Sequence, residues 1–522
     1  MSELVLGWRV TADLEPQYWL NIGAKPGLQP EDELVTVHPE TMATHSIIVG
    51  QSGSGKSFFL GRLIEELVLQ TKANLLILDP NADFIRVHKI QDSTLWTQAT
   101  YDLDNHRGKL PHEDSRQTFK YRWNSIPTKV LTRRVPIKKA YPNTYPLVLW
   151  LPSISADLLF DEESTLQSQL YHCHAFTQAI VKLTMLKQAG DEFAKKLGMT
   201  AENAISEAER LYKIWSADFA AQKAPVISKT ARLVVEINKA FDKKQLVKVI
   251  PSLEEETRRK LGFTWYSEAD SEWWKKVVRL MSPWQINQLL NHAIKSLSYV
   301  DNNAGRFYFG KVREYLGTNI LTGKPQLDAG KKGRITVIDL PSLGDYSTRL
   351  LAINVVIRDE WNRARADWAY ALEQSADKDD RVPTFIVLDE AHHFIPAEPQ
   401  GKAESVLRDQ FRTIAAEGRK YGIFLILASQ RPDKLDPIVL SECENKALMR
   451  LDSRAVLSSS KKNLGLDDMP EQTLEKCLEF PQSGTLIAGR WASGEPRLLY
   501  CAARRTVEGG RNLRAEYWAT PY

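Results

Sequence analysis

Gly50-Gln51-Ser52-Gly53-Ser54-Gly55-Lys56-Ser57 is the stretch of sequence that decides the fold. Its pattern is G-x-x-x-x-G-K-S. A short apolar run, Ser46–Val49, comes directly before it, and apolar residues recur at helical spacing between positions 58 and 67. A strand, a glycine loop and a helix in this order form the usual context of a phosphate-binding loop. The alternative, a Gly/Ser-rich turn with a stray lysine, leaves the flanking periodicity unexplained.

The residue types of this loop suit a polyphosphate. Glycines permit backbone angles and close approaches that bulkier residues cannot adopt. Their N–H groups and the N-terminus of the following helix form a cavity for anions. We expect the Lys56 amine to reach the β- and γ-phosphates of ATP, and the Ser57 hydroxyl to hold Mg²⁺. The expected nucleotide-binding residues are Gly50, Gln51, Ser52, Gly53, Ser54, Gly55, Lys56, Ser57 and Phe58.

A second motif lies far downstream, where Asp389 and Glu390 close the apolar run Thr384–Leu388. Paired acids are common on protein surfaces, but these follow a buried-strand pattern in a chain that already has the glycine loop. Asp389 is expected to hold Mg²⁺, and Glu390 to polarise the water that attacks the γ-phosphate. We interpret the next residues, His392 and His393, as loop histidines, with nucleotide sensing as the alternative.

Two further apolar runs also end in polar side chains. Asn74–Asp79 and Ile423–Ala428 are unbroken apolar runs, as in strands that are buried on both faces of a parallel sheet. Their polar ends would lie at the carboxyl edge, where open α/β sheets bind ligands. Asp79 and Asp83 could position Mg²⁺ or the attacking water, or they could cap the next helix. Gln430 could read the γ-phosphate, or cap the strand end.

Composition excludes several classes of protein. The 522 residues carry a net charge of +4, so a nucleic-acid surface would have to be a local patch. Four scattered cysteines without a C-x-x-C argue against a disulfide framework and a zinc site, and favour a reducing cytoplasm. No second ligand cluster completes His172-Cys173-His174 as a metal site. Neither a signal peptide nor an apolar run of about 20 residues for a membrane span is visible.

The order of patterns predicts an α/β fold with a mainly parallel sheet and a helical insertion. Strand-like pieces at Leu4–Val10 and Gln17–Ile22 predict a short N-terminal β lead-in. Helical periodicity at Leu166–Leu186 and Ser271–Leu290 predicts the insertion. The expected units are 1–45 (N-terminal β region), 46–154 (core, first part), 155–330 (helical insertion), 331–492 (core, second part) and 493–522 (C-terminal tail).

Arginines and lysines cluster in three places. The loop that includes Arg133, Arg134, Lys138 and Lys139 could be solvated or could face DNA. An amphipathic helix at about 403–420 ends in Arg419 and Lys420, with Gly422 as its C-terminal stop. The tail from Ser493 carries four arginines and could cross onto a neighbouring subunit in a ring; these are Arg497, Arg504, Arg505 and Arg511.

Taken together, the motifs resemble those of HerA-type ATPases of the HerA/FtsK superfamily. The resemblance covers about 46–90 and 335–490, with a helical insertion between, as the family also has. The segments that carry it, in chain order, are Gly50–Ser57, Leu78–Asp83, Leu388–His392, Glu417–Gly422, Ser429–Pro432 and Leu440–Asn445.

This resemblance implies a RecA-like P-loop NTPase core and a homo-hexameric motor that draws double-stranded DNA through its pore. It gives Lys56, Glu390 and Gln430 the catalytic roles described above. It makes Arg419 the candidate arginine finger, which would reach the nucleotide of the adjacent subunit, where such an arginine stabilises the transferring phosphoryl group. Arg412 is the rival finger, and the alternative interpretation of Arg419 is a cation favoured by the helix dipole.

One departure from the family pattern concerns the N-terminal region. HerA proteins usually have a substantial β-barrel before the glycine loop, whereas only 49 residues precede Gly50 here. This resembles shortened HerA-like ATPases of anti-phage systems, which act with a separate effector such as a nuclease or a sirtuin-like protein. Two other functions stay open: an ATP-regulated scaffold or switch that activates an effector without sustained translocation, and a small-molecule kinase. The water-activating Glu390 argues against the kinase.

Overall fold

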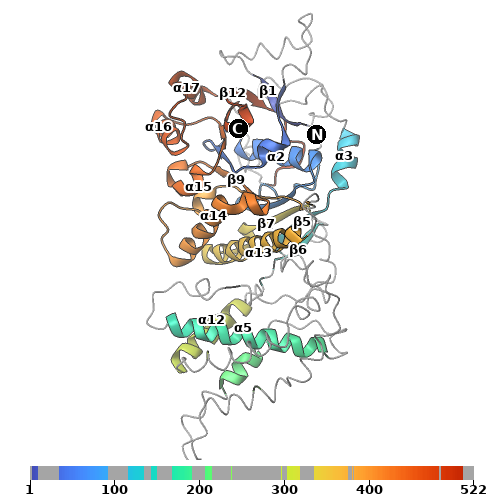
Figure 1. Ribbon diagram of the computed structural model, residues 1–522, viewed down its shortest axis with the longest axis vertical. Helices are drawn as coiled ribbons and strands as arrows, with labels where there is room; N and C mark the ends of the chain where they lie inside the picture. The colour runs from blue at the N-terminus through green and yellow to red at the C-terminus, as the bar shows by residue number, and fades with distance from the viewer. Residues whose placement is uncertain are drawn as a thin grey trace, which may run out of the picture.

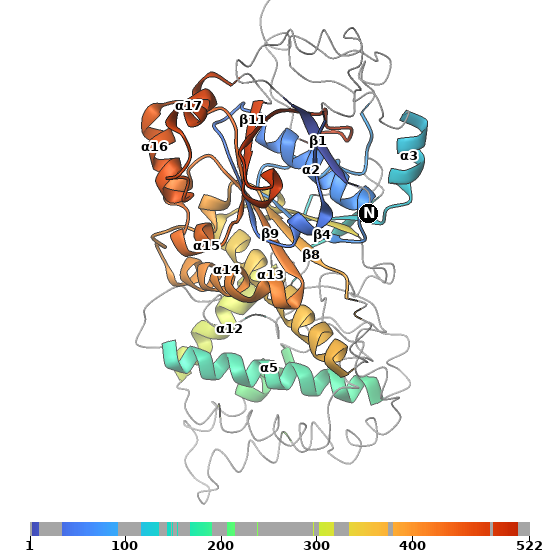
Figure 2. The ribbon, with the colours of Figure 1, turned by 45° about the horizontal axis from the view of Figure 1, so that its top comes forward.

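A computed structural model gives the fold of the chain (Figures 1 and 2). The described residues are 3–9, 34–91, 116–134, 143–147, 149, 154, 167–190, 206–213, 237, 296, 302–317, 334–373, 379, 381–480 and 484–509. Twelve strands within this part of the chain form one sheet, in the order β2-β1-β12-β11-β10-β3-β9-β8-β4-β7-β5-β6.

Eight of these strands, from β10 to β6 in the sheet order, run parallel to one another. They are β3 (Ser46–Val49), β4 (Asn74–Asp79), β5 (Thr128–Thr132), β6 (Thr144–Pro146), β7 (Ile335–Asp339), β8 (Thr384–Leu388), β9 (Ile423–Ser429) and β10 (Asn445–Leu448). Every residue of β3, β8 and β9 is buried, because helices cover both faces of the sheet. The prediction of an α/β fold with a mainly parallel sheet is confirmed.

The remaining four strands extend the sheet in antiparallel pairing beyond β10. They are β1 (Leu4–Arg9), β2 (Leu34–Val37), β11 (Gly484–Ala488) and β12 (Arg497–Cys501). The β lead-in is therefore part of the main sheet, next to the C-terminal strand β12. The predicted strand Gln17–Ile22 lies outside the described residues. The idea of a tail from Ser493 that crosses to another subunit is wrong for β12, which pairs within its own sheet.

Two cores lie on opposite faces of the sheet (Figure 1). On one face are α2 (Lys56–Gln70) and α3 (Arg116–Asn124). On the other are α13 (Tyr346–Glu373) and α14 (Lys402–Tyr421). Smaller helices follow along the chain: α15 (Pro437–Ser441), α16 (Arg454–Asn463) and α17 (Glu471–Glu479).

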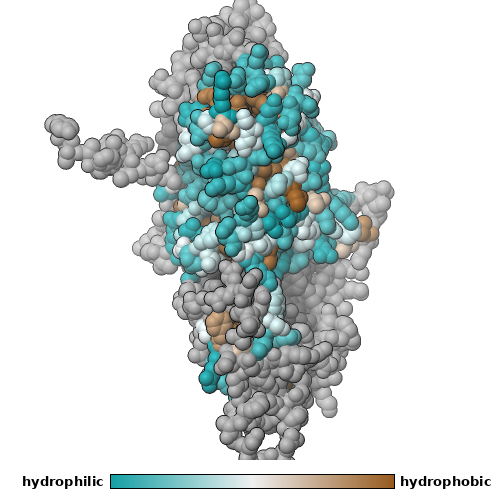
Figure 3. Space-filling view, turned by 90° about the vertical axis from the view of Figure 1, so that its left-hand side faces the viewer, coloured by the Kyte–Doolittle hydropathy of each residue, from teal (hydrophilic) through white to brown (hydrophobic). Residues whose placement is uncertain are grey.

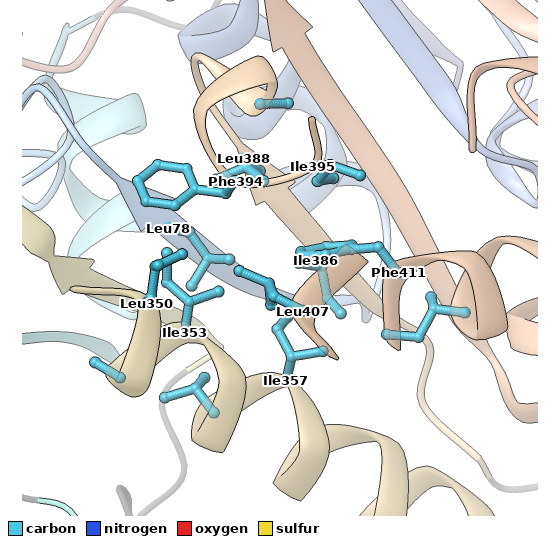
Figure 4. Close-up of a cluster of buried hydrophobic side chains, with 14 of the residues drawn as sticks. Leu78, Leu350, Ile353, Ile357, Ile386, Leu388, Phe394, Ile395, Leu407 and Phe411 are labelled. Atoms are coloured by element: carbon cyan, nitrogen blue, oxygen red, sulfur yellow. The ribbon is translucent and has the colours of Figure 1, made fainter. Parts of the chain in front are cut away.

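The core beneath α13 and α14 fixes the strands that carry the second motif (Figure 4). Ile353 on α13 and Leu407 and Phe411 on α14 are at most 1% exposed and converge on Ile386 of β8. Burying each such side chain contributes about 1.5–3 kcal/mol. This packing holds the end of β8, and with it Asp389, at a fixed place on the carboxyl edge.

The described part of the helical insertion includes α5 (Gln167–Gly190) and α12 (Asn302–Gly317), which pack on each other below α13 (Figure 1). α5 matches the predicted helix Leu166–Leu186, whereas Ser271–Leu290 lies outside the described residues. His174 is buried, and its ring nitrogens contact the Tyr308 hydroxyl and the Ile154 carbonyl, so it is a core histidine. The boundaries of the predicted units stay predictions.

The face that carries α14 to α17 is mostly hydrophilic, with apolar side chains in small separate patches (Figure 3). No helix among the residues described above is long and apolar enough to cross a membrane.

Candidate functional site

The candidate site lies at the carboxyl edge of four adjacent parallel strands, β3, β9, β8 and β4. Each of these strands ends directly before a loop that carries a predicted site residue. The sequence separates these residues by more than 330 positions, and the parallel order of the sheet brings them together.

The glycine loop joins β3 to α2, and its conformation requires two of its glycines. Gly53 has φ +73° and Gly55, which directly precedes α2, has φ +99°, and side chains disfavour both angles. At Gly50, a Cβ atom would lie 2.6 Å from the Ser54 Oγ and 2.9 Å from the Met449 Cβ. The first N–H groups of α2 point out of the helix end, where an anion can accept from them.

Other loop residues differ in their surroundings. Ser52 is exposed, whereas the Ser54 hydroxyl is buried without a hydrogen-bond partner. The Gln51 N–H donates to the Arg450 carbonyl at 2.9 Å, which anchors the loop to the segment after β10. Phe58 is half-buried and packs against the core beneath α2, so its role in nucleotide binding stays a prediction.

Lys56 begins α2 and turns its amine back over the loop. Its Nζ donates to the Gln51 carbonyl at 3.3 Å and lies 3.8 Å from the Glu390 Oε1. Burial lowers the pKa of Lys56, while the carboxylates of Glu390 and Asp389 oppose that shift. Phosphate oxygens could replace these protein acceptors, so the buried Lys56 amine is well placed to bind a phosphate.

Ser57 meets two carboxylates. Its Oγ donates to the Asp83 Oδ2 at 3.0 Å and lies 3.5 Å from the Asp389 Oδ2. Burial, and next the neighbouring Glu390, raise the pKa of Asp389 to about 7, although Lys56 opposes them. A divalent cation would stabilise the charged form of such a carboxylate.

The donor set suits Mg²⁺. A hydroxyl and one or two carboxylates are hard oxygen ligands, and Mg²⁺ in phosphate sites completes its shell with water and phosphate oxygens. No group of three or more His, Cys, Asp or Glu side chains in the described ranges forms a complete protein cage. The geometry therefore fits a metal that arrives with a nucleotide, held by Ser57 and Asp389.

Glu390 sits in a strained and crowded position. Its φ of +46° is left-handed, which is uncommon for a residue with a side chain and is often found at functional sites. Gln430 at the end of β9 donates from its Nε2 to the Glu390 Oε1. The Glu390 Oε2 is buried without a hydrogen-bond partner and lies 3.4 Å from the His392 Nδ1. The Oε1 atom is thus held by Gln430, whereas Oε2 has no hydrogen-bond donor and could accept one from a water molecule.

His392, in the short 3-10 helix after β8, contacts Ser429 at the end of β9. Its Nδ1 lies 3.0 Å from the Ser429 Oγ, and burial, together with the nearby His393, lowers its pKa to about 4. It is therefore neutral at physiological pH.

Asp79, the last residue of β4, and Asp83, in the loop after it, take different roles. Asp79 is fully buried and accepts from the N–H groups of Asp83 at 3.0 Å and Phe84 at 2.8 Å, so it caps the turn. Burial raises its pKa to about 7. Asp83 faces Ser57, so of this pair it is the one placed toward the metal position.

Arg419 lies at the end of α14, where Gly422 adopts φ +75° and stops the helix as expected. Its guanidinium pairs with Glu444, and about 40% of its side chain is exposed. The rival Arg412 forks onto Asp436, donating to its Oδ2 at 2.7 Å from Nη2 and 3.1 Å from Nε. Asp436 is fully buried and caps α15 through the Val439 N–H, so Arg412 has a structural partner.

The basic loop after β5 is partly accounted for. The Arg134 guanidinium forks onto the buried Asp339 at 2.7 and 3.0 Å, so this arginine serves the fold. Lys138 and Lys139 lie outside the described residues.

Sequence reasoning missed two buried arginines near the site. Arg504 and Arg505 were expected to be tail arginines, but both are buried within this chain against α2. Two acids, Glu65 and Glu66, in the otherwise apolar pattern of α2 are the sequence signal that could have indicated buried partners.

Comparison with known proteins gives the chain its family. The family model described as "Helicase HerA, central domain" matches residues 28–360, which is more than half of the chain. A second model, "ATPase family associated with various cellular activities (AAA)", matches residues 350–451.

Individual relatives match over shorter stretches. The "DNA double-strand break repair helicase HerA" of Saccharolobus solfataricus is 27% identical over 175 residues, which are 33% of this chain and 32% of that protein. Its namesake from Pyrococcus furiosus is 29% identical over 162 residues, 27% of this chain and 29% of that protein. The matches thus span about a third of the length of these relatives.

Among solved structures, VirB4 of Thermoanaerobacter pseudethanolicus aligns over 96% of this chain and 97% of its own, with 12% identity and a TM-score of 0.44. The family model is the stronger finding, because it spans the glycine loop, the insertion and the strands on both sides of it. The chain belongs to the HerA family of P-loop ATPases.

Proposed function

We propose that this chain is an ATP-hydrolysing motor of the HerA type, which forms a homo-hexameric ring and moves double-stranded DNA through its pore. One observation carries the ATPase part. The Lys56 amine lies 3.8 Å from the Glu390 carboxylate, and the Ser57 hydroxyl lies 3.5 Å from the Asp389 carboxylate. This is the arrangement that phosphoryl transfer to water requires.

In this proposal each side chain has a separate task. Lys56 binds the β- and γ-phosphates, while Ser57 and Asp389 hold Mg²⁺, which when bound neutralises charge on the phosphate oxygens. Glu390 accepts the proton of the attacking water through its unpartnered Oε2. Gln430, which contacts the other oxygen of Glu390, reads the γ-phosphate from the end of β9.

The proposal predicts salt-sensitive binding to duplex DNA. If pore residues contact about six to ten phosphates, raising the salt from about 50 to 200 mM lowers the affinity by about 10³–10⁵-fold. Fluorescence anisotropy with duplexes of two unrelated sequences measures this. The two titrations should coincide, because phosphate contacts carry no sequence information. Absence of DNA affinity at the lowest salt contradicts the motor.

The assembly is tested separately by the mass of the particle in solution, with and without nucleotide and DNA. A ring of six is expected with nucleotide, because the proposed arginine finger acts only across a subunit interface. A particle that stays monomeric under all conditions contradicts both the ring and the finger.

We further propose a separate effector protein, such as a nuclease or a sirtuin-like enzyme, in DNA processing or anti-phage defence. The second candidate function is an ATP-regulated switch that activates such an effector without sustained translocation. One contact favours this second function. Gln430 donates to Glu390 and directly precedes Arg431, which is half exposed, so the hydrolytic site is connected to the surface segment after β9. DNA-stimulated ATP turnover supports the motor, whereas effector activation that persists without turnover supports the switch.

A further inference from the structure

A C-terminal arm, Ala502–Gly509, follows β12 and lies against the back of the candidate site. Three of its N–H groups donate to backbone carbonyls of the site's supports. Ala502 donates to Leu6 at 2.9 Å, Val507 donates to Lys89 at 2.8 Å, and Gly509 donates to Asp83 at 2.9 Å. The arm therefore joins β1 and the loop after β4, which carries Asp83.

Arg504 is the side chain of this arm that points to the nucleotide loop. It is fully buried, and its guanidinium donates to four acceptors: the carbonyls of Ser57 at 3.4 Å, Asp83 at 3.1 Å and Val507 at 3.4 Å, and the Thr506 hydroxyl at 3.2 Å. Two of these acceptors belong to the residues whose side chains meet at the proposed metal position.

The neighbours of Arg504 are shaped around it. A Cβ atom at position 61 of α2 would lie 2.4 Å from the Arg504 Cδ, so glycine leaves the space that the side chain fills. The guanidinium also lies over the Phe84 ring, 4.7 Å from its centre. Burial lowers the pKa of Arg504, but the carboxylates of Glu508, Glu65, Asp83 and Asp79 oppose that shift, and arginine keeps its charge in proteins.

The loop that Arg504 holds is itself strained. Ala82 has φ +65°, a left-handed conformation that is unfavourable for a residue with a side chain. Such a conformation persists only where the surroundings determine it. Asp79 fixes the inner side of this turn, and Arg504 and Gly509 fix its outer side through the Asp83 carbonyl.

We propose that Arg504 is a positioning residue for the metal–nucleotide site. Through their carbonyls it holds Ser57 and Asp83 at the separation that Mg²⁺ requires. The inference rests on the proposed ATPase function. An arginine of the C-terminal arm, remote in sequence from every recognised motif, then controls the geometry of the phosphate-binding loop.

Arg504→Lys is the direct test. An ammonium group cannot span acceptors on both α2 and the loop after β4, because it lacks the planar fork of guanidinium. In the lysine variant the Gly509 N–H still holds the Asp83 carbonyl, but the link that Arg504 forms between the Ser57 and Asp83 carbonyls is lost. A shift of about 1 Å in such a group can cost about 10²-fold. We expect the Mg²⁺ concentration for half-maximal ATPase activity to rise about tenfold, with a smaller change in the affinity for Mg²⁺-free nucleotide.

Arg505→Lys is the matched control. Arg505 is buried beside Arg504, but its guanidinium binds Glu65 at 3.0 Å and Glu66 at 2.7 Å, both on α2. This change should lower the melting temperature while leaving the Mg²⁺ dependence unchanged. It separates loss of a buried arginine in general from loss of positioning.

Gly61→Ala is the second variant, and it displaces Arg504 without replacing it. In an exposed helix this substitution is stabilising. Here the new methyl group meets the flexible Arg504 side chain, so we expect the same rise in the Mg²⁺ requirement as for Arg504→Lys. The two changes should not add in the double variant, because they act on one contact.

The measurements are ATPase activity against Mg²⁺ concentration, nucleotide binding with and without Mg²⁺, and melting temperature. A shifted Mg²⁺ dependence in Arg504→Lys and Gly61→Ala but not in Arg505→Lys supports the inference. Equal Mg²⁺ dependence in all variants overturns the inference. If Arg504→Lys fails to fold, wild-type Mg²⁺ dependence in Gly61→Ala overturns it. If the wild-type protein itself hydrolyses no ATP, the proposed ATPase function fails, and the inference fails with it.

Discussion

Replacing Glu390 with glutamine is expected to lower the rate of ATP turnover by about 10²–10⁴-fold, the range that a positioned general base contributes. The amide keeps the size of the carboxylate but cannot accept the proton of the attacking water. Nucleotide binding should persist, because Lys56, Ser57 and the loop amides stay in place. Single-turnover hydrolysis with labelled ATP, together with equilibrium binding of the nucleotide, measures both quantities.

Glu479→Gln provides the control for this experiment, because it makes the same chemical change at an exposed position at the end of α17. It should leave turnover and binding unchanged. If Glu390→Gln keeps more than about a tenth of the wild-type turnover, another group is the general base. The variant should also accumulate the ATP-bound state, in which the proposed switch function can be examined without hydrolysis.

The carboxyl edge could be predicted from the sequence because burial on both faces leaves an unbroken apolar run. β3, β8 and β9 have no exposed residue, so their sequences show no alternation and their polar ends are conspicuous. Once the strands are parallel, their ends share an edge. This is why Lys56 and Glu390 could be expected to meet although the sequence separates them widely.

The antiparallel extension could not be predicted in the same way. β12 is short, its first two residues are partly exposed, and its pairing with β1 spans nearly the whole chain. No local pattern specifies such a contact. The sequence does not decide the role of Asp79, for a related reason. A strand-end acid can cap a turn or face a ligand, and only the positions of the Asp83 and Phe84 N–H groups decide between the two.

Buried charge on α2 is the clearest failure of sequence reasoning. Glu65 and Glu66 would normally mark a solvated face, but α2 lies between the sheet and the C-terminal arm, and both are at most 2% exposed. Arg62 and Arg505 supply their partners. Buried acids are tolerated only with such partners, and one of them here, Arg505, comes from a segment about 440 positions away.

Replacing the two candidate arginine fingers is expected to have opposite effects on stability and on ATP turnover. Arg412→Ala leaves the buried carboxylate of Asp436 without its fork, so we expect a loss of about 1–3 kcal/mol in the free energy of unfolding. Arg419→Ala breaks only a half-exposed pair with Glu444, which is worth at most about 1 kcal/mol. If Arg419 acts in the neighbouring subunit, its loss should instead lower turnover by about 10³–10⁵-fold with little change in stability.

Mixing variants tests whether Arg419 acts across a subunit interface. An Arg419→Ala subunit has an intact hydrolytic site and no finger, whereas a Glu390→Gln subunit has an intact finger and an inactive site. In mixed rings, some Arg419→Ala sites border a Glu390→Gln subunit and receive its arginine. Turnover should therefore reappear in the mixture, although neither variant is active alone, and reach its maximum near equal proportions. An Arg419→Ala protein that is fully active alone removes the finger assignment, and a mixture that stays inactive at every ratio shows that Arg419 acts within its own subunit.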